Sequence, residues 1–122
     1  MSEVVAEFPK TLIVSDNMVE AEDLIEMLTP EGLGPVALAR DVGKARFVVE
    51  QSRQSLHLII FGLSMHIHES SRFVETLDRS GTALLVLDGP VSLGVGEGAG
   101  CLNRPFSTND VMAALARLKM SR

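Results

Sequence analysis

The feature that most constrains the fold is a regular alternation of short apolar segments with helix-like segments along the chain. Five apolar segments predict buried strands, over residues 10–15, 36–39, 56–61, 82–87 and 99–102. Helical periodicity predicts helices over residues 18–28, 42–53, 70–78 and 110–119. Strands separated by helices pair in parallel through right-handed crossovers. We therefore predict one α/β domain over residues 1–122, with a doubly wound, five-stranded parallel sheet of flavodoxin-like order.

The connection between the last two predicted strands departs from this alternation. It is short and rich in glycine, with Gly89, Gly94, Gly96, Gly98 and Gly100. We expect the fourth helix to be shortened or lost, and a loop to take its place. A dinucleotide-binding loop is the less favoured reading, because such a loop follows the first strand and opens a helix.

Composition excludes several classes of function. The net charge of −5 argues against direct nucleic-acid binding, because contact with phosphates requires a basic surface. The single cysteine allows no intrachain disulfide and fits a reducing compartment. The start of the chain lacks a signal-peptide pattern, and no apolar stretch is long enough to cross a membrane. We expect a cytoplasmic protein without nucleic-acid or membrane partners.

The carboxyl ends of the first, third and fourth predicted strands should meet at one crevice, where open α/β sheets bind their ligands. They bring together Ser15 with Asp16, Gly62 and Asp88, and Arg104 arrives from the loop after the fifth strand. A carboxylate at the end of the third strand could accept a phosphoryl group, but Gly62 offers no side chain. We expect Arg104 to turn into the crevice and pair with Asp88, Asp16 or both.

Three segments resemble the receiver domain of bacterial response regulators: LIVSDN at 12–17, LIIFGLSM at 58–65 and CLNRPFS at 101–107. The resemblance runs from about residue 10 to residue 119. It implies a phosphoacceptor aspartate at position 62, two acids for Mg²⁺ at 15 and 16, a hydroxyl at 88, a switching aromatic at 101 and a lysine at 104. This chain instead has Gly62, Ser15 before Asp16, Asp88, Cys101 and Arg104.

These departures fall on the residues that the family's chemistry needs. Phosphoryl transfer requires a nucleophile and a hard cation, and Asp88 adds negative charge where a phosphate would lie. The interpretation is a degenerate phosphorylation pocket, formed by Ser15, Asp16, Gly62, Asp88 and Arg104, with altered switch positions at Asp88 and Cys101. We expect a non-catalytic pseudo-receiver of the two-component, phosphorelay type, with no cofactor and no metal.

Such a module would act by protein–protein interaction with a signalling protein whose identity the sequence does not give. Two alternatives stay open. The chain could be a phosphorelay receiver that uses a displaced acceptor, Asp16 or Asp88, or a flavodoxin-like domain that binds a small ligand in the crevice.

The expected working surface is the face formed by the fifth strand and the last helix. Loss of the fourth helix should expose apolar side chains there, around Val111, Leu115 and Leu118. We expect partner binding or a homodimer through this face. In the alternative, apolar residues of the glycine-rich loop fold back over the gap and leave a monomer.

Two further patterns admit a sharper reading that we do not favour. His66, His68 and Glu69 could contribute to a zinc site, but alternate residues in a loop seldom converge without a third ligand from elsewhere, so we expect surface histidines. Cys101 could be a redox sensor beside Arg104, but its place in an apolar strand predicts an inert, buried thiol.

Overall fold

The computed structural model describes residues 8–65, 67–78, 82–89 and 99–118. All five strands pair in parallel, in the order β2-β1-β3-β4-β5, which confirms the predicted doubly wound, flavodoxin-like sheet. The strands are β1 (Thr11–Val14), β2 (Val36–Ala39), β3 (Leu58–Phe61), β4 (Ala83–Leu87) and β5 (Ala99–Leu102). The helices are α1 (Met18–Leu28), the 3-10 turn η1 (Thr29–Glu31), α2 (Val42–Gln51), α3 (His68–Asp78) and α4 (Thr108–Arg117). None of the helices described combines the length and apolarity needed to cross a bilayer.

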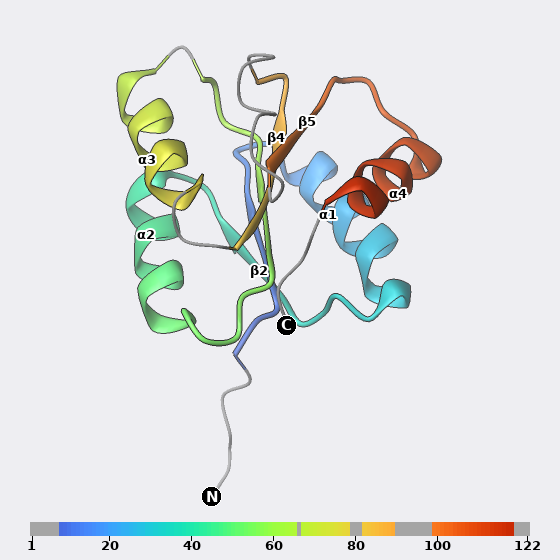
Figure 1. Ribbon diagram of the computed structural model, residues 1–122, viewed down its shortest axis with the longest axis horizontal. Helices are drawn as coiled ribbons and strands as arrows, with labels where there is room; N and C mark the ends of the chain where they lie inside the picture. The colour runs from blue at the N-terminus through green and yellow to red at the C-terminus, as the bar shows by residue number, and fades with distance from the viewer. Residues whose placement is uncertain (1–7, 66, 79–81, 90–98, 119–122) are drawn as a thin grey trace, which may run out of the picture.

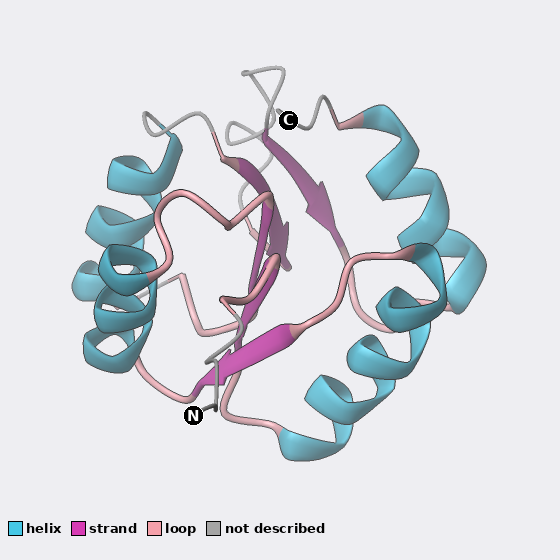
Figure 2. Ribbon diagram, turned by 90° about the horizontal axis from the view of Figure 1, so that it is seen from below, coloured by secondary structure: helices cyan, strands magenta, loops and turns pink. Residues whose placement is uncertain are grey.

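The sheet is the middle layer of three. Helices α2 and α3 cover one face, and α1 and α4 cover the other (Figures 1 and 2). Successive strand residues point to opposite faces. Leu12 and Val14 therefore pack in the core beneath α2 and α3, whereas Ile13 packs in the core beneath α1 and α4. Because both faces are covered, the three central strands are buried along their length, which explains why their sequences are continuously apolar.

Side-chain caps fix where three helices begin. Asn17, Asp41 and Ser107 each accept a hydrogen bond from the backbone N–H three residues later. Helix α1 continues into η1 and ends at Gly32, whose φ of 77° lies in the left-handed region. The predicted helix boundaries differ by up to two residues: α2 ends earlier, α3 begins at His68, and α4 is shifted to begin at Thr108 and end at Arg117.

The expected exposure of α4 is wrong. Val111, Leu115 and Leu118 are 0%, 7% and 9% exposed, and they pack in the core between α4 and the sheet. Their spacing of three or four residues places all three on the side that faces the strands. The expectations of a lost fourth helix and of a glycine-rich loop concern residues 90–98, which lie outside the described residues.

The start of α4 anchors the loop that carries Arg104, and it is held by a capping box. Asp110 N–H donates to Ser107 Oγ at 3.1 Å, and Ser107 N–H donates to Asp110 Oδ2 at 2.9 Å. Ser107→Ala should lower the free energy of unfolding by about 1 kcal/mol, because one N–H loses its partner. Urea denaturation measures this. Thr108→Ala, at an exposed position next to the cap, is the matched control, and an equal loss in both variants would contradict the assignment.

Candidate functional site

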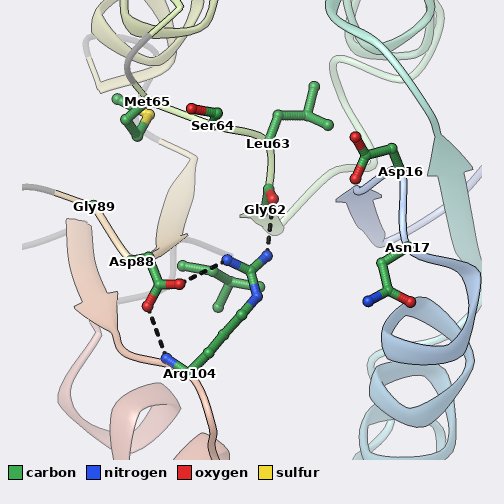
Figure 3. A pocket seen from close by; sticks show the side chains of 10 residues that line it. Asp16, Asn17, Gly62, Leu63, Ser64, Met65, Asp88, Gly89 and Arg104 are labelled. Carbon is green, nitrogen blue, oxygen red and sulfur yellow. Dashed lines mark hydrogen bonds and ion pairs between the residues drawn. The ribbon is translucent and has the colours of Figure 1, made fainter.

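A pocket of about 800 Å³ lies at the carboxyl ends of the central strands. Four of the five predicted site residues line it: Asp16 after β1, Gly62 after β3, Asp88 after β4 and Arg104 after β5 (Figure 3). The remaining lining residues are Asn17, Leu63, Ser64, Met65, Leu87 and Gly89. The strand order brings these positions together, because β1, β3 and β4 are adjacent and end at the same edge.

The guanidinium of Arg104 is the hub of the site. Its Nη1 donates to Asp88 Oδ2 at 2.9 Å, and its Nη2 donates to the carbonyl oxygen of Gly62 at 2.8 Å (Figure 3). Its Nε and Nη2 donate to the two carboxylate oxygens of Glu20, the latter at 3.0 Å, which makes a bidentate ion pair. The hydrogen bonds that Arg104 donates to Glu20, and then those to Asp88, raise the pKa of Arg104 further above its ordinary value. The prediction that Arg104 turns into the crevice and pairs with Asp88 is confirmed.

Glu20 is the site residue that sequence reasoning missed. The spacing of apolar residues in α1 predicts Val19, Leu24, Ile25 and Leu28 on one face and the acids on the other. The Glu20 side chain is nevertheless only 10% exposed and points toward Arg104, whereas Val19 is 71% exposed. Glu20 lies one and four residues before the buried Ala21 and Leu24, so it borders the buried side of α1 at its first turn. This place beside buried residues is the feature of the sequence that could have identified Glu20 as a site residue.

Ser15 and Asp16 have separate surroundings. Ser15 is 3% exposed, and its hydroxyl lies 3.2 Å from Glu20 Oε1 and 3.3 Å from the carbonyl oxygen of Asn17. The Ser15 hydroxyl therefore helps to hold the Glu20 carboxylate in place. Asp16 is exposed on the opposite wall from Arg104 and has no ion pair within the described residues (Figure 3). Arg104 thus pairs with Asp88 and Glu20, and the suggested pairing with Asp16 is not formed.

The missing side chain at Gly62 gives the Arg104–Glu20 pair its room. A Cβ placed on Gly62 would lie 3.0 Å from Arg104 Nη2, 3.2 Å from Leu87 Cδ1 and 3.3 Å from Glu20 Oε1. These contacts are tighter than ordinary van der Waals separations, so even alanine would push on the ion pair. A larger side chain at position 62 would have to displace the guanidinium that now binds the Gly62 carbonyl.

Asp88 is held in a conformation that non-glycine residues seldom adopt. Its φ is 55°, in the left-handed region. The Asp88 N–H donates to the Leu102 carbonyl at 2.8 Å, and Asp88 Oδ1 accepts from the Arg104 N–H at 2.8 Å. Hydrogen bonds from the Arg104 main chain, and then from its side chain, lower the pKa of the Asp88 carboxyl from its ordinary value of 3.8. Asp88 therefore remains a carboxylate that both stabilises the turn and fixes Arg104.

The two less favoured sequence patterns do not form a reactive group among the residues that the structure describes. Cys101 lies in β5 and is half-buried, and burial raises the pKa of its thiol, which is the opposite of a reactive thiolate. His68 is exposed on α3, and His66 lies outside the described residues. In the part of the chain that the structure describes, no group of three His, Cys, Asp or Glu side chains is arranged to hold a metal.

The chemistry of the pocket disfavours an anionic ligand. Three carboxylates, of Asp16, Glu20 and Asp88, accompany one guanidinium, so the site is net negative. Most of the Arg104 N–H groups are already donated within the protein. The carboxylates of Glu20 and Asp88 are in turn bound to Arg104, so among the described residues of the pocket Asp16 is the acid without an ion pair.

Replacing Arg104 should reveal how strongly the carboxylates that it binds depend on its charge. Arg104→Met should lower the free energy of unfolding by about 2 kcal/mol, because it leaves the mostly buried Glu20 carboxylate without a counter-charge. Glu20→Gln should cost less in the Arg104→Met background than in the wild type. A double-mutant cycle by urea denaturation measures this coupling. Additive effects of the two substitutions would contradict the network.

Asp88 should make folding sensitive to acid. Because its folded-state pKa is lowered, its contribution to stability is present above pH 3.8 and is lost as the pH falls below that value. Asp88→Asn keeps a residue that tolerates the left-handed region but cannot ionise. Stability should therefore fall less steeply in this variant between about pH 4 and pH 2. Glu22→Gln, which neutralises an exposed acid of α1, is the control, and a wild-type slope in Asp88→Asn would reject the assignment.

Comparison by sequence identifies no relative. No protein-family model matches the chain, and no curated protein is significantly similar to it. Comparison by structure, in contrast, finds many solved structures that match this chain.

Three solved structures illustrate the match. A signal receiver domain of an HD domain-containing protein from Pseudomonas fluorescens has a TM-score of 0.70 at 19% identity, covering 93% of this chain and 88% of that one. A response regulator receiver domain protein from Clostridium thermocellum has a TM-score of 0.71 at 18% identity, covering 88% and 91%. A putative two-component system response regulator/GGDEF domain protein has a TM-score of 0.67 at 20% identity, and the match covers 89% of this chain but 48% of that protein. With its strand order and its pocket at the strand ends, this chain has the fold of the response regulator receiver domains.

Proposed function

We propose that this chain is a pseudo-receiver, a non-catalytic signalling module of the two-component type that acts by protein–protein contact and takes no phosphoryl group on aspartate. One observation carries the proposal. A Cβ on residue 62 would lie 3.0 Å from Arg104 Nη2 and 3.3 Å from Glu20 Oε1, so an acceptor side chain there would crowd this ion pair. The domain thus has the receiver fold with an internal ion pair beside the position of the acceptor.

The donor set does not fit the Mg²⁺ ion that receiver chemistry would need. Mg²⁺ prefers several oxygen ligands in near-octahedral arrangement. Here Asp16 is exposed without an ion pair among the described residues, Ser15 is buried against Glu20, and Asp88 is bound through both oxygens to Arg104. A phosphate would also meet a net negative pocket, which raises the cost of bringing it in. We therefore derive no phosphoryl-transfer step for this chain.

The proposed partner is another signalling protein. The solved structures that share the fold include a receiver domain from an HD domain-containing protein and a response regulator with a GGDEF domain. These names place the fold in the same proteins as HD and GGDEF domains. By analogy, this chain would present a fixed surface to a partner in the cytoplasm, without catalysis of its own.

Each of the two alternatives is supported by a specific observation. Asp16 is exposed in the pocket without an ion pair among the described residues, so it is the acid to test as a displaced acceptor. Asp88 is a poorer candidate, because both of its oxygens are engaged by Arg104. The pocket volume of about 800 Å³ also leaves room for a small ligand.

Treatment with acetyl phosphate and Mg²⁺, read by intact mass, tests the proposal. No mass increase of one phosphoryl group should appear, whereas a conventional receiver treated in parallel should gain one. A stable adduct on the wild type would overturn the proposal, and its loss in Asp16→Asn would assign the displaced acceptor. A ligand that raises the melting temperature and loses this effect when the pocket is altered would favour the small-ligand alternative.

Restoring the acceptor alone should not restore the chemistry. Gly62→Asp places a carboxylate against Arg104 and Glu20 and leaves Ser15 and Asp88 unchanged, so acetyl phosphate should leave it unmodified. A fourfold variant is the comparison: Ser15→Asp, Gly62→Asp, Asp88→Thr and Arg104→Lys together. Phosphorylation of the single Gly62→Asp variant would contradict the view that the ion pair blocks this position.

A further inference from the structure

A second pocket, of about 480 Å³, lies along α2 and α3 and shares no lining residue with the pocket at the strand ends. Arg46 of α2 lines it together with His68, Glu69, Arg72 and Thr76 of α3. These two helices cover the face of the sheet that α1 and α4 do not touch (Figures 1 and 2). His68, Arg72 and Thr76 are spaced by four residues, so they form one stripe along α3.

This pocket carries a net positive charge, whereas the whole chain carries a net negative charge. The net charge of the protein is −5, yet Arg46 and Arg72 face a single lining carboxylate, that of Glu69. Arg46 Nη1 lies 3.9 Å from Glu69 Oε2, and both side chains are more than half exposed, so this ion pair is weak. Within the described residues, the guanidinium of Arg72 has no ion pair. The exposed acids nearest in sequence on these helices, Glu50 and Glu75, pair with neither arginine.

The guanidinium of Arg46 is positioned by the core. It lies over the ring of Phe73, 5.7 Å from the centroid, and Phe73 is 3% exposed. The Phe73 ring in turn packs against Phe61, with 5.9 Å between centroids. Stacking on an immobile ring holds the guanidinium while leaving its N–H edge open to a ligand. Less conformational entropy is then lost when a ligand binds.

We propose that this pocket binds a phosphate group, either as inorganic phosphate or as the end of a phosphomonoester. Two guanidinium groups offer paired N–H donors in the geometry that a phosphate accepts, and a dianion offsets two positive charges better than a carboxylate does. The Thr76 hydroxyl donates to the Arg72 carbonyl at 3.0 Å, so the donors for the ligand are the arginines and His68. Two arginines on an acidic chain are too few for nucleic acid, and their charge repels metal cations. This inference is independent of the function proposed above.

Amide NMR titration at constant ionic strength tests the proposal, with inorganic phosphate, glycerol 2-phosphate and acetate as the three probes. Either phosphate probe should cause saturable shifts confined to α2 and α3, and acetate should bind more weakly. Tighter binding of glycerol 2-phosphate would indicate a monoester as the source, tighter binding of inorganic phosphate would indicate the free ion, and equal binding would show that the pocket recognises the phosphate group alone. Shifts that do not saturate, or acetate binding as tight as phosphate, would overturn the proposal.

Variants decide whether the arginines are responsible. Arg46→Gln with Arg72→Gln should weaken phosphate binding about tenfold or more, because two charge-assisted donors are lost. Arg117→Gln removes an exposed arginine from α4 on the other face of the sheet and should leave binding unchanged. Arg72→Gln alone, whose side chain makes no ion pair in the described residues, covers the case in which the double variant folds poorly. Wild-type affinity in both Arg72→Gln and the double variant would reject the site.

Discussion

The guanidinium of Arg104 is the interaction on which the functional edge of this molecule depends. One side chain joins the first turn of α1 through Glu20, the end of β3 through the Gly62 carbonyl and the end of β4 through Asp88. Each contact explains an otherwise unusual residue. Gly62 leaves room for the guanidinium, Asp88 adopts a left-handed φ that Arg104 stabilises, and Glu20 is a carboxylate that is 10% exposed. Such a network is self-consistent only when all of its members are present.

This ion pair lies beside Gly62, where the backbone rather than a side chain takes part in the site. A Cβ at this position would lie close to the Arg104 guanidinium and the Glu20 carboxylate, and the Gly62 carbonyl accepts a hydrogen bond from Arg104. Electrostatics works against phosphate entry, since three carboxylates accompany one guanidinium, which is paired with two of them. The aliphatic cores that stabilise the fold lie on either side of the sheet, and Gly62, Asp88 and Arg104 do not belong to them.

The features that were predicted correctly from the sequence depend on the periodicity of its apolar residues. The predictions that failed concern the direction of a single side chain. Sheet order and the convergence on Arg104 and Asp88 follow from apolar spacing and from strand ends meeting at one edge. Glu20 was missed because several acids in α1 suggest a solvated face, and only the position of Arg104, 84 residues later, draws it inward. The exposure expected for Leu115 was wrong because it was inferred from a helix thought to be missing, whereas the side chain packs in the core beneath α1 and α4. Neither the contact of Glu20 with Arg104 nor the packing of Leu115 in the core can be inferred from a local sequence pattern.

The two pockets differ in whether their arginine donors are already used. Arg104 carries its charge into a crevice where its carboxylate partners consume the N–H groups, so the charge contributes to structure and little is left for a ligand. Arg46 and Arg72 lie in a pocket with one weakly held carboxylate, and stacking on Phe73 orders Arg46 without occupying its hydrogen bonds. Affinity for an anion follows from donors that are both ordered and unoccupied. By that criterion the place to expect a phosphate group on this molecule is the α2–α3 surface, even though the fold itself points to the ends of the strands.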